Sequence, residues 1–258
     1  MNPKNTSFRR KALRALLFAA SLMTEACFAQ SALFDWTSTD IQALYGHGFV
    51  LGESKISTIT LEHADGWKYG DNFFFVDLYQ RWKPNGINVE AYGEWYSHLS
   101  LKKTTGWSPP LPGLKDILLS GGVNAGSKPA DSPFLAYLGG IRFDFSAPRF
   151  DYLQLYVHAY KNDQNLHTGM QITPVWSVPF TVGEQRFKFR GFMDFSTSQT
   201  GAGSWHWLAQ PQLLFDVGAL QGTPDKLMVG CELWYWKNKY GVKGKTDVAP
   251  QVALYYAF

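Results

Sequence analysis

Apolar and polar residues alternate along many segments of this sequence, and within these segments the charged residues fall on one of the two alternating sets of positions. In residues 88–101, one alternate set of positions holds Val89 and Trp95, and the other holds Glu90 and Glu94. A period of two is that of a β-strand, whose successive side chains point to opposite faces. An Arg or Lys that faces lipid at the bilayer midplane costs about 2–4 kcal/mol. This sorting therefore favours a barrel with an outer face in lipid and a polar lumen.

Segments of this kind recur along the chain, separated by residues typical of turns. We count twelve of them, at residues 40–48, 57–64, 72–81, 88–101, 117–126, 134–145, 152–161, 169–180, 187–195, 204–217, 226–238 and 247–258. An even number of such segments is typical of outer-membrane barrels. No linker or low-complexity tract divides them. We predict one all-β domain, a twelve-stranded antiparallel transmembrane β-barrel of the outer-membrane type.

Two observations bear on this barrel. The chain ends on Phe258, an aromatic residue on the more apolar phase of the last segment, and a closed barrel removes the sheet edge that a terminal strand would otherwise expose. In contrast, Pro174, Pro211 and Pro250 fall inside predicted strands, where each removes a ladder hydrogen bond. Strand ends or bulges would both accommodate them. Because both faces are partly aromatic, a sandwich with one wet face is the alternative fold.

The N-terminal segment resembles an export signal. Four cations between residues 9 and 14 precede an apolar run at residues 15–23, and small residues lead to a cut after Ala29. The run is too short for a transmembrane helix, which needs about 20 residues. We therefore predict a signal peptide at residues 1–29 and an exported barrel domain at residues 30–258.

Charge and cysteine content narrow the functions further. The whole chain carries a net charge of +3, and residues 1–29 hold five cations and one carboxylate, so residues 30–258 carry about −1. The apparent basicity belongs to the signal peptide and does not indicate nucleic-acid binding. Cys231 is the one cysteine after the cut, which excludes an intrachain disulfide.

Four stretches carry a resemblance to a known family: DNFFFVDLYQR at 71–81, VEAYGEWYSHLSLKKTTG at 89–106, GFMDFSTSQTGAGSWHWLAQPQLLFDVG at 191–218 and WYWKNKYGVKG at 234–244. In this order they resemble the Tsx-type nucleoside-specific channels of Gram-negative outer membranes. The resemblance implies a monomeric barrel in outer-membrane lipid with a narrow pore that passes nucleosides and deoxynucleosides by diffusion. It also implies loops that phages or colicins can bind.

A lumen that selects nucleosides needs aromatic faces for the base and polar or charged groups for the sugar hydroxyls. In each predicted strand, the alternating set of positions that carries the charged residues supplies both kinds of side chain. The candidate lumenal residues are Phe73, Phe75, Asp77, Tyr92, Glu94, Tyr96, Arg142, Asp144, Lys188, Arg190, Asp194, Glu232 and Trp234. For each charged residue, the alternative role is a cross-barrel ion pair that fills the lumen.

Enzyme motifs are missing from the sequence. It contains no HExxH, no paired CxxC and no GxSxG, and its six His residues are not spaced as metal ligands, so we predict neither an enzyme nor a metal or other cofactor. Two alternatives to a channel stay open. One is a receptor or structural barrel with a blocked lumen. The other is a membrane-embedded lipid hydrolase, since His98 and Ser100 lie on one strand face.

Overall fold

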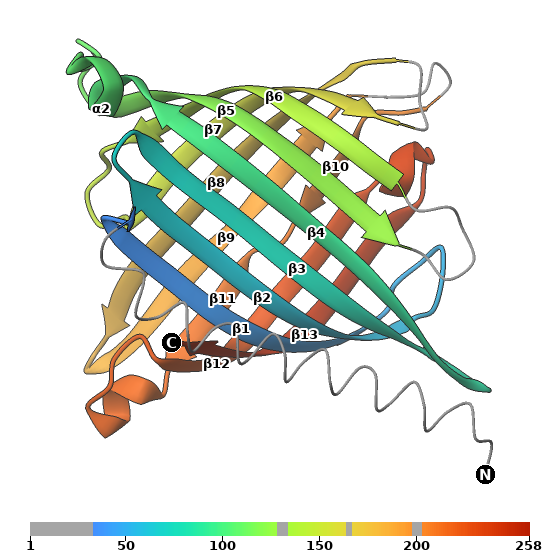
Figure 1. Ribbon diagram of the computed structural model, residues 1–258. Coiled ribbons are helices and arrows are strands. Elements are labelled where there is room, and N and C mark those ends of the chain that lie inside the picture. Colours follow the sequence, from blue (N-terminus) through green and yellow to red (C-terminus); the bar gives the residue numbers. More distant parts are fainter. Residues whose placement is uncertain (1–32, 128–133, 164–166, 198–202) are drawn as a thin grey trace.

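The chain forms a single closed antiparallel β-barrel (Figure 1). The computed structural model describes residues 33–127, 134–163, 167–197 and 203–258. The predicted signal peptide at residues 1–29 lies outside the described residues and stays a prediction. Among the helices of the described ranges, none has the length and apolar character needed to cross a membrane.

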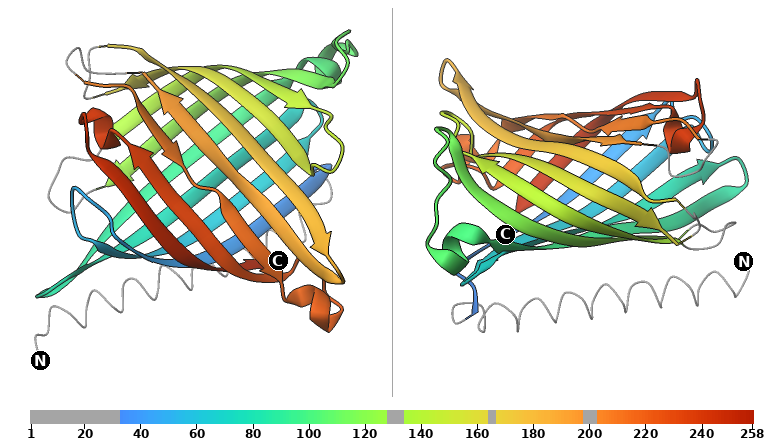
Figure 2. Two further views of the ribbon diagram at one scale, coloured as in Figure 1. Left: turned by 180° about the vertical axis from the view of Figure 1, so that it is seen from behind. Right: turned by 90° about the horizontal axis from the view of Figure 1, so that it is seen from above.

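Consecutive strands pair with one another around the barrel, and β1 pairs with β13 to close it. The strands are β1 (Trp36–His47), β2 (Lys55–Trp67), β3 (Gly70–Lys83), β4 (Gly86–Ser100), β5 (Leu114–Ser127), β6 (Phe134–Phe145), β7 (Tyr152–Asn162), β8 (Gly169–Val182), β9 (Gln185–Ser196), β10 (His206–Ala209), β11 (Gln212–Asp216), β12 (Leu227–Lys237) and β13 (Thr246–Ala257). Figure 2 shows the barrel from behind, so that the strands farthest from the viewer in Figure 1 lie in front.

The strands β10 and β11 are two parts of one barrel strand. Both pair with β9 on one side and β12 on the other, and Pro211 lies in the gap between them without shifting either register. Gly191 has a φ of +150°, and a Cβ there would lie 2.5 Å from the carbonyl oxygen of Gln210. A residue without a side chain is thus needed beside the break. Counted this way, the barrel has twelve strands, which confirms the prediction.

The other two prolines lie where a ladder is already interrupted. The pairing of β8 with β9 runs to Ile172 and resumes at Val175, so it skips Pro174. The pairing of β13 with β1 begins at Gln251, one residue after Pro250. Each missing N–H therefore falls at a gap in pairing, as is usual for proline in sheets.

The two faces of the barrel carry opposite kinds of side chain. Exposed apolar residues such as Val76, Leu119 and Val252 point outward, whereas polar residues such as Gln42 and Arg142 are buried inside. On the outward phase, charged residues lie only within three positions of a strand end. These are Lys55, Asp65, Lys115, Lys161 and Lys237. An apolar band limited by charged rims is typical of a barrel in a membrane, and it excludes the sandwich.

The chain enters and leaves the barrel at the same end, which we call the terminal end. The helix α2 (Leu101–Thr105) and the 3₁₀ turn η1 (Gly218–Gln221) lie there, at the left of Figure 1. The connection after β4 begins with α2, because Ser100 caps its first turn and Gly106, with a φ of 75°, ends it. The 3₁₀ turn η2 (Lys239–Gly241) lies at the opposite end.

A charge placed on the outward face will test the membrane band. Val76 points outward from the middle of β3, whereas Val248 points outward near the start of β13. We expect Val76→Arg to lower the free energy of unfolding in lipid vesicles by about 2–4 kcal/mol, and Val248→Arg to lower it by about 0–1 kcal/mol. Denaturant titration in vesicles measures both values. Equal effects at the two positions would contradict a lipid-facing band.

Candidate lumenal site

All thirteen predicted site residues lie on the inward phase, but the structure divides them among separate groups. Six of them line one cavity of about 470 Å³ in the part of the lumen next to the opposite end. These six are Phe75, Asp77, Tyr92, Glu94, Asp194 and Trp234. A volume of this size lies within the usual range of small-molecule sites.

Three carboxylates in the cavity are held by uncharged donors. Asp77 accepts hydrogen bonds from the hydroxyls of Thr60 at 2.5 Å and Tyr79 at 2.6 Å. Asp194 accepts from the Thr173 hydroxyl at 2.5 Å and from the Gln171 amide at 3.1 Å. Since a carboxylate has about four acceptor positions, each keeps about two for a solute.

Glu94 is held more fully than the other two carboxylates. The Tyr92 hydroxyl donates to one of its oxygens, the Tyr96 hydroxyl donates to the other at 2.9 Å, and the Asn124 amide donates at 2.9 Å. Within the described residues, none of Glu94, Asp77 and Asp194 takes part in an ion pair. The cavity is therefore acidic at its inner part.

Aromatic rings form much of the remaining cavity wall. The rings of Phe75 and Tyr92 have centroids 5.9 Å apart, and Trp234 meets Tyr79 edge to face at 6.4 Å. Phe192 adds a further ring. The indole nitrogen of Trp234 is buried and has no hydrogen-bond partner in the described residues. The wall thus offers flat apolar faces and an unused donor beside the carboxylates.

Lys239 in η2 lines the cavity where it opens toward the opposite end, which we call the cavity mouth, and links two loops there. Its ammonium donates to the carbonyl of Val50 at 2.8 Å and to the Asp247 carboxylate at 2.5 Å. The other oxygen of Asp247 accepts from the backbone of Val50 at 2.5 Å. This arrangement ties the turn after β12 to the chain after β1.

The remaining predicted residues do not line the cavity. Phe73 and Tyr96 pack with Leu138 and Tyr160 in an apolar cluster. Glu232 accepts from the amides of Gln212 and Gln251. Lys188 pairs with Asp225 at 3.0 Å near the terminal end. The sequence pattern indicated the face on which these residues lie and held no information on their level in the lumen.

Arg142 and its predicted neighbour Asp144 belong to an ion-pair group at the inner surface. The Arg142 guanidinium donates to both oxygens of Asp71 at 2.7 and 2.6 Å and lies 2.7 Å from Asp144. His98 is 2.7 Å from the same Asp71. The side chain of Arg142 on β6 thus reaches past β4 and β5 to β3.

Arg190 makes the longest connection. Its guanidinium donates to Glu62 at 2.5 Å and lies 3.7 Å from Asp40. These carboxylates belong to β2 and β1, on the far side of β11, β12 and β13 from β9.

Sequence reasoning missed Glu62, Asp71 and Thr60 as site residues. Each lies on the inward phase of its strand, so the alternation of β2 and β3 held the signal that would have found them. Their partners are 128, 71 and 17 residues away along the chain. No local pattern indicates such pairs.

The His98 and Ser100 side chains do not meet as a catalytic pair. His98 contacts Asp71, and the Ser100 hydroxyl donates to Asp116. A different pair, Ser120 and His158, lies 2.8 Å apart and is buried. No carboxylate of the described residues contacts His158, so the geometry lacks the third member of a hydrolase triad.

Comparisons with known proteins give a family and a fold. The family described as "Domain of unknown function (DUF5020)" matches residues 39–258. No curated protein matches the sequence significantly. Among solved structures, the KdgM porin is similar with a TM-score of 0.50 and 11% identity, over 86% of this chain and 99% of that one. A KdgM porin in complex with disordered oligogalacturonate gives a TM-score of 0.49 at the same identity and coverage. At this identity, the likeness concerns the fold alone.

The anchor of the cavity mouth predicts a stability effect. We expect Lys239→Ala to lower the free energy of unfolding by about 3–5 kcal/mol, since it leaves the fully buried Asp247 carboxylate without its cation. The control is Lys83→Ala, which removes an exposed 3.8 Å pair with Glu53 and should cost about 1 kcal/mol or less. Denaturant unfolding in detergent or lipid measures both. A Lys239 effect as small as the control would show that the anchor is not stabilising.

Proposed function

Given that the chain belongs to the DUF5020 family, we propose from the geometry of its lumen that it is an outer-membrane channel for nucleosides and deoxynucleosides. The observation that carries this proposal is the cavity, in which Asp77 and Asp194 keep free acceptor positions beside the rings of Phe75, Tyr92 and Trp234.

The chemistry of the cavity matches the two halves of a nucleoside. A base can stack on an aromatic ring, and such contacts contribute about 1–3 kcal/mol per base in nucleic-acid-binding proteins. The hydroxyls of the sugar can donate to carboxylates, and hydrogen bonds to charged acceptors are stronger than neutral ones. Asp77 and Asp194 would accept the sugar hydroxyls, while Trp234 would face the base and donate its indole N–H.

The charge of the cavity predicts which solutes it rejects. Asp77 and Asp194, which form no ion pair within the described residues, repel anions in the narrow part of a lumen, where the field of fixed charges is strong. Nucleoside monophosphates and oligogalacturonate, the solute named for the KdgM complex, carry the wrong charge for this cavity. A neutral nucleoside does not meet this barrier. Binding should stay weak, because a solute held tightly does not pass.

The proposal includes a route to the membrane. The signal peptide at residues 1–29 would direct export, and the mature chain would insert as a monomer, since its apolar band surrounds the closed barrel. Phage or colicin binding at the loops would be a secondary use of the same exposed ends.

A second candidate, a receptor with a blocked lumen, is favoured by the ion pairs of Arg142 and Arg190. These side chains reach across the interior between strands that are not neighbours. A folded barrel that binds solute but conducts under no condition would favour the receptor.

Nucleoside binding can be measured from the tryptophan fluorescence of the refolded mature chain. We expect adenosine and thymidine to change the fluorescence in a saturable way, whereas glucose and adenosine monophosphate should not. The variant Trp234→Ala removes one aromatic ring from the cavity wall and should weaken nucleoside binding by about 1–3 kcal/mol, as expected for the loss of one stacking ring. Calorimetric titration supplies the affinity of this variant.

The matched control for Trp234 is Trp95→Ala, because Trp95 points outward from β4 and is 51% exposed. It should leave nucleoside affinity unchanged. Equal losses from the two variants, or equal responses to adenosine and glucose, would contradict a nucleoside site in the cavity.

The acidic cavity also predicts ion selectivity. In a planar bilayer with a potassium chloride gradient, the reversal potential should show a preference for cations over anions. The double variant Asp77→Asn/Asp194→Asn keeps the size and one acceptor oxygen of each side chain while removing two charges. We expect this variant to lose most of the cation preference. An unchanged reversal potential would show that the carboxylates do not set the field along the permeation path.

A further inference from the structure

The lumen between the cavity and the terminal end is crossed by side chains from opposite walls. Arg190 on β9 donates to Glu62 on β2 at 2.5 Å, and the residues are 128 positions apart. Four barrel strands separate β9 from β2 on the shorter way round, with β10 and β11 counted as one. A contact of this kind runs through the lumen and not along the wall.

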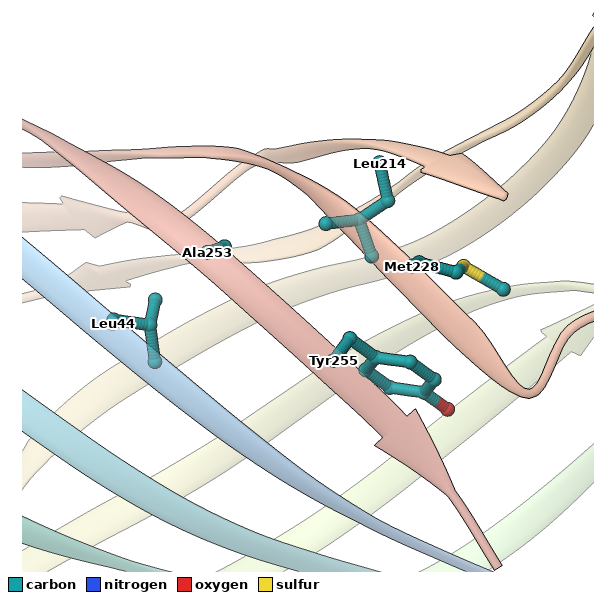
Figure 3. Close-up of a cluster of buried hydrophobic side chains, with 5 residues drawn as sticks. All are labelled: Leu44, Leu214, Met228, Ala253 and Tyr255. Carbon is teal, nitrogen blue, oxygen red and sulfur yellow. The ribbon is translucent and has the colours of Figure 1, made fainter. Parts of the chain in front are cut away.

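An apolar cluster fills the wall next to Arg190. Figure 3 shows its members, Leu44, Leu214, Met228, Ala253 and Tyr255, all of which are buried. The Arg190 guanidinium lies 5.6 Å from the centre of the Tyr255 ring. The cation is thus held between carboxylates on one side and an aromatic face on the other.

The second arginine, Arg142 on β6, lies along the inner surface and reaches past β5 and β4 to β3. Arg142 binds Asp71 through two hydrogen bonds, lies 2.7 Å from Asp144 and covers the Tyr156 ring at 5.7 Å. None of the side chains bound by Arg142 or Arg190 lines the cavity at the opposite end. The two arginine groups therefore occupy a different level of the lumen from the cavity.

We propose that Asp40, Glu62, Asp71, Arg142, Arg190 and Tyr255 form a partition that closes the lumen at rest, and that Arg190 is its moving element. This inference rests on the proposed function, because it concerns the same permeation path. Solute passes from the cavity to the terminal end when Arg190 leaves Glu62.

The two arginines differ in how firmly they are held. Arg142 has a bidentate partner and a second carboxylate within 2.7 Å, and its side chain is 3% exposed. Arg190 has one short contact to Glu62 and a longer one of 3.7 Å to Asp40, and its side chain is 13% exposed. Two carboxylates on adjacent strands give Arg190 alternative partners. Only a side chain has to move, because the backbone ladder of the wall stays intact.

Single-channel recording of the refolded mature chain in potassium chloride tests this partition. The wild type should show low mean conductance with brief openings. The variant Arg190→Ala/Glu62→Ala removes both charges and the bulk of the bridge, and its mean conductance should rise severalfold. The control Arg186→Ala/Asp225→Ala removes a 3.0 Å pair at the terminal end, with both side chains more than two-fifths exposed, and should behave as the wild type.

If the alanine pair does not fold, Arg190→Gln/Glu62→Gln replaces it, since it leaves a polar side chain at both positions and removes the charges. Its open time should lengthen. Full conductance in the wild type, or a folded Arg190 variant that stays as closed as the wild type, would overturn the proposal. Nucleoside binding measured by fluorescence reports on the cavity alone. An absence of nucleoside binding would refute the proposed substrate, and the conductance measurement would still test the partition independently.

Discussion

The closed ladder of backbone hydrogen bonds decides which face of the barrel each side chain occupies. In lipid, every backbone N–H and C=O must find a partner within the protein, and the pairing of β1 with β13 provides the last set. Once the ladder is closed, each residue of a strand has a fixed face. The alternation then commits one half of the side chains to lipid and the other half to the lumen, so that the lumen must accommodate every charge in the middle of the strands.

This constraint explains what the sequence could and could not predict. The twelve strands and the faces of all thirteen candidate residues followed from the period of two. Pro211 was the one proline that visibly divided a strand, and the ladder continued past it. The levels and partners of the lumenal residues did not follow. Period fixes a face, but the strand tilt and the circumference decide that Arg190 meets Glu62 and that Lys188 lies apart, near Asp225.

The lumen uses its carboxylates in two ways. Near the opposite end, Asp77 and Asp194 are held by hydroxyl and amide donors, which orient them without neutralising them. Farther along, Asp71 and Glu62 are neutralised by arginines. Desolvated ion pairs are weak evidence for stability, because the cost of burying both charges offsets their attraction. Stability therefore does not account for these arginine–carboxylate pairs, and we relate their position in the lumen to permeation.

The number of strands makes a long side chain necessary for closure. An eight-stranded barrel is filled by ordinary side chains, whereas barrels of sixteen to eighteen strands leave an aqueous channel. Twelve strands lie between these limits, so apolar residues such as Leu44 and Leu214 fill only the region beside their own strands. To reach from β9 to β2, the chain needs a residue with the length of arginine and a fixed charge to hold it there. Arg190 meets both conditions, and the same length that closes the lumen permits the side chain to swing aside without disturbing the wall.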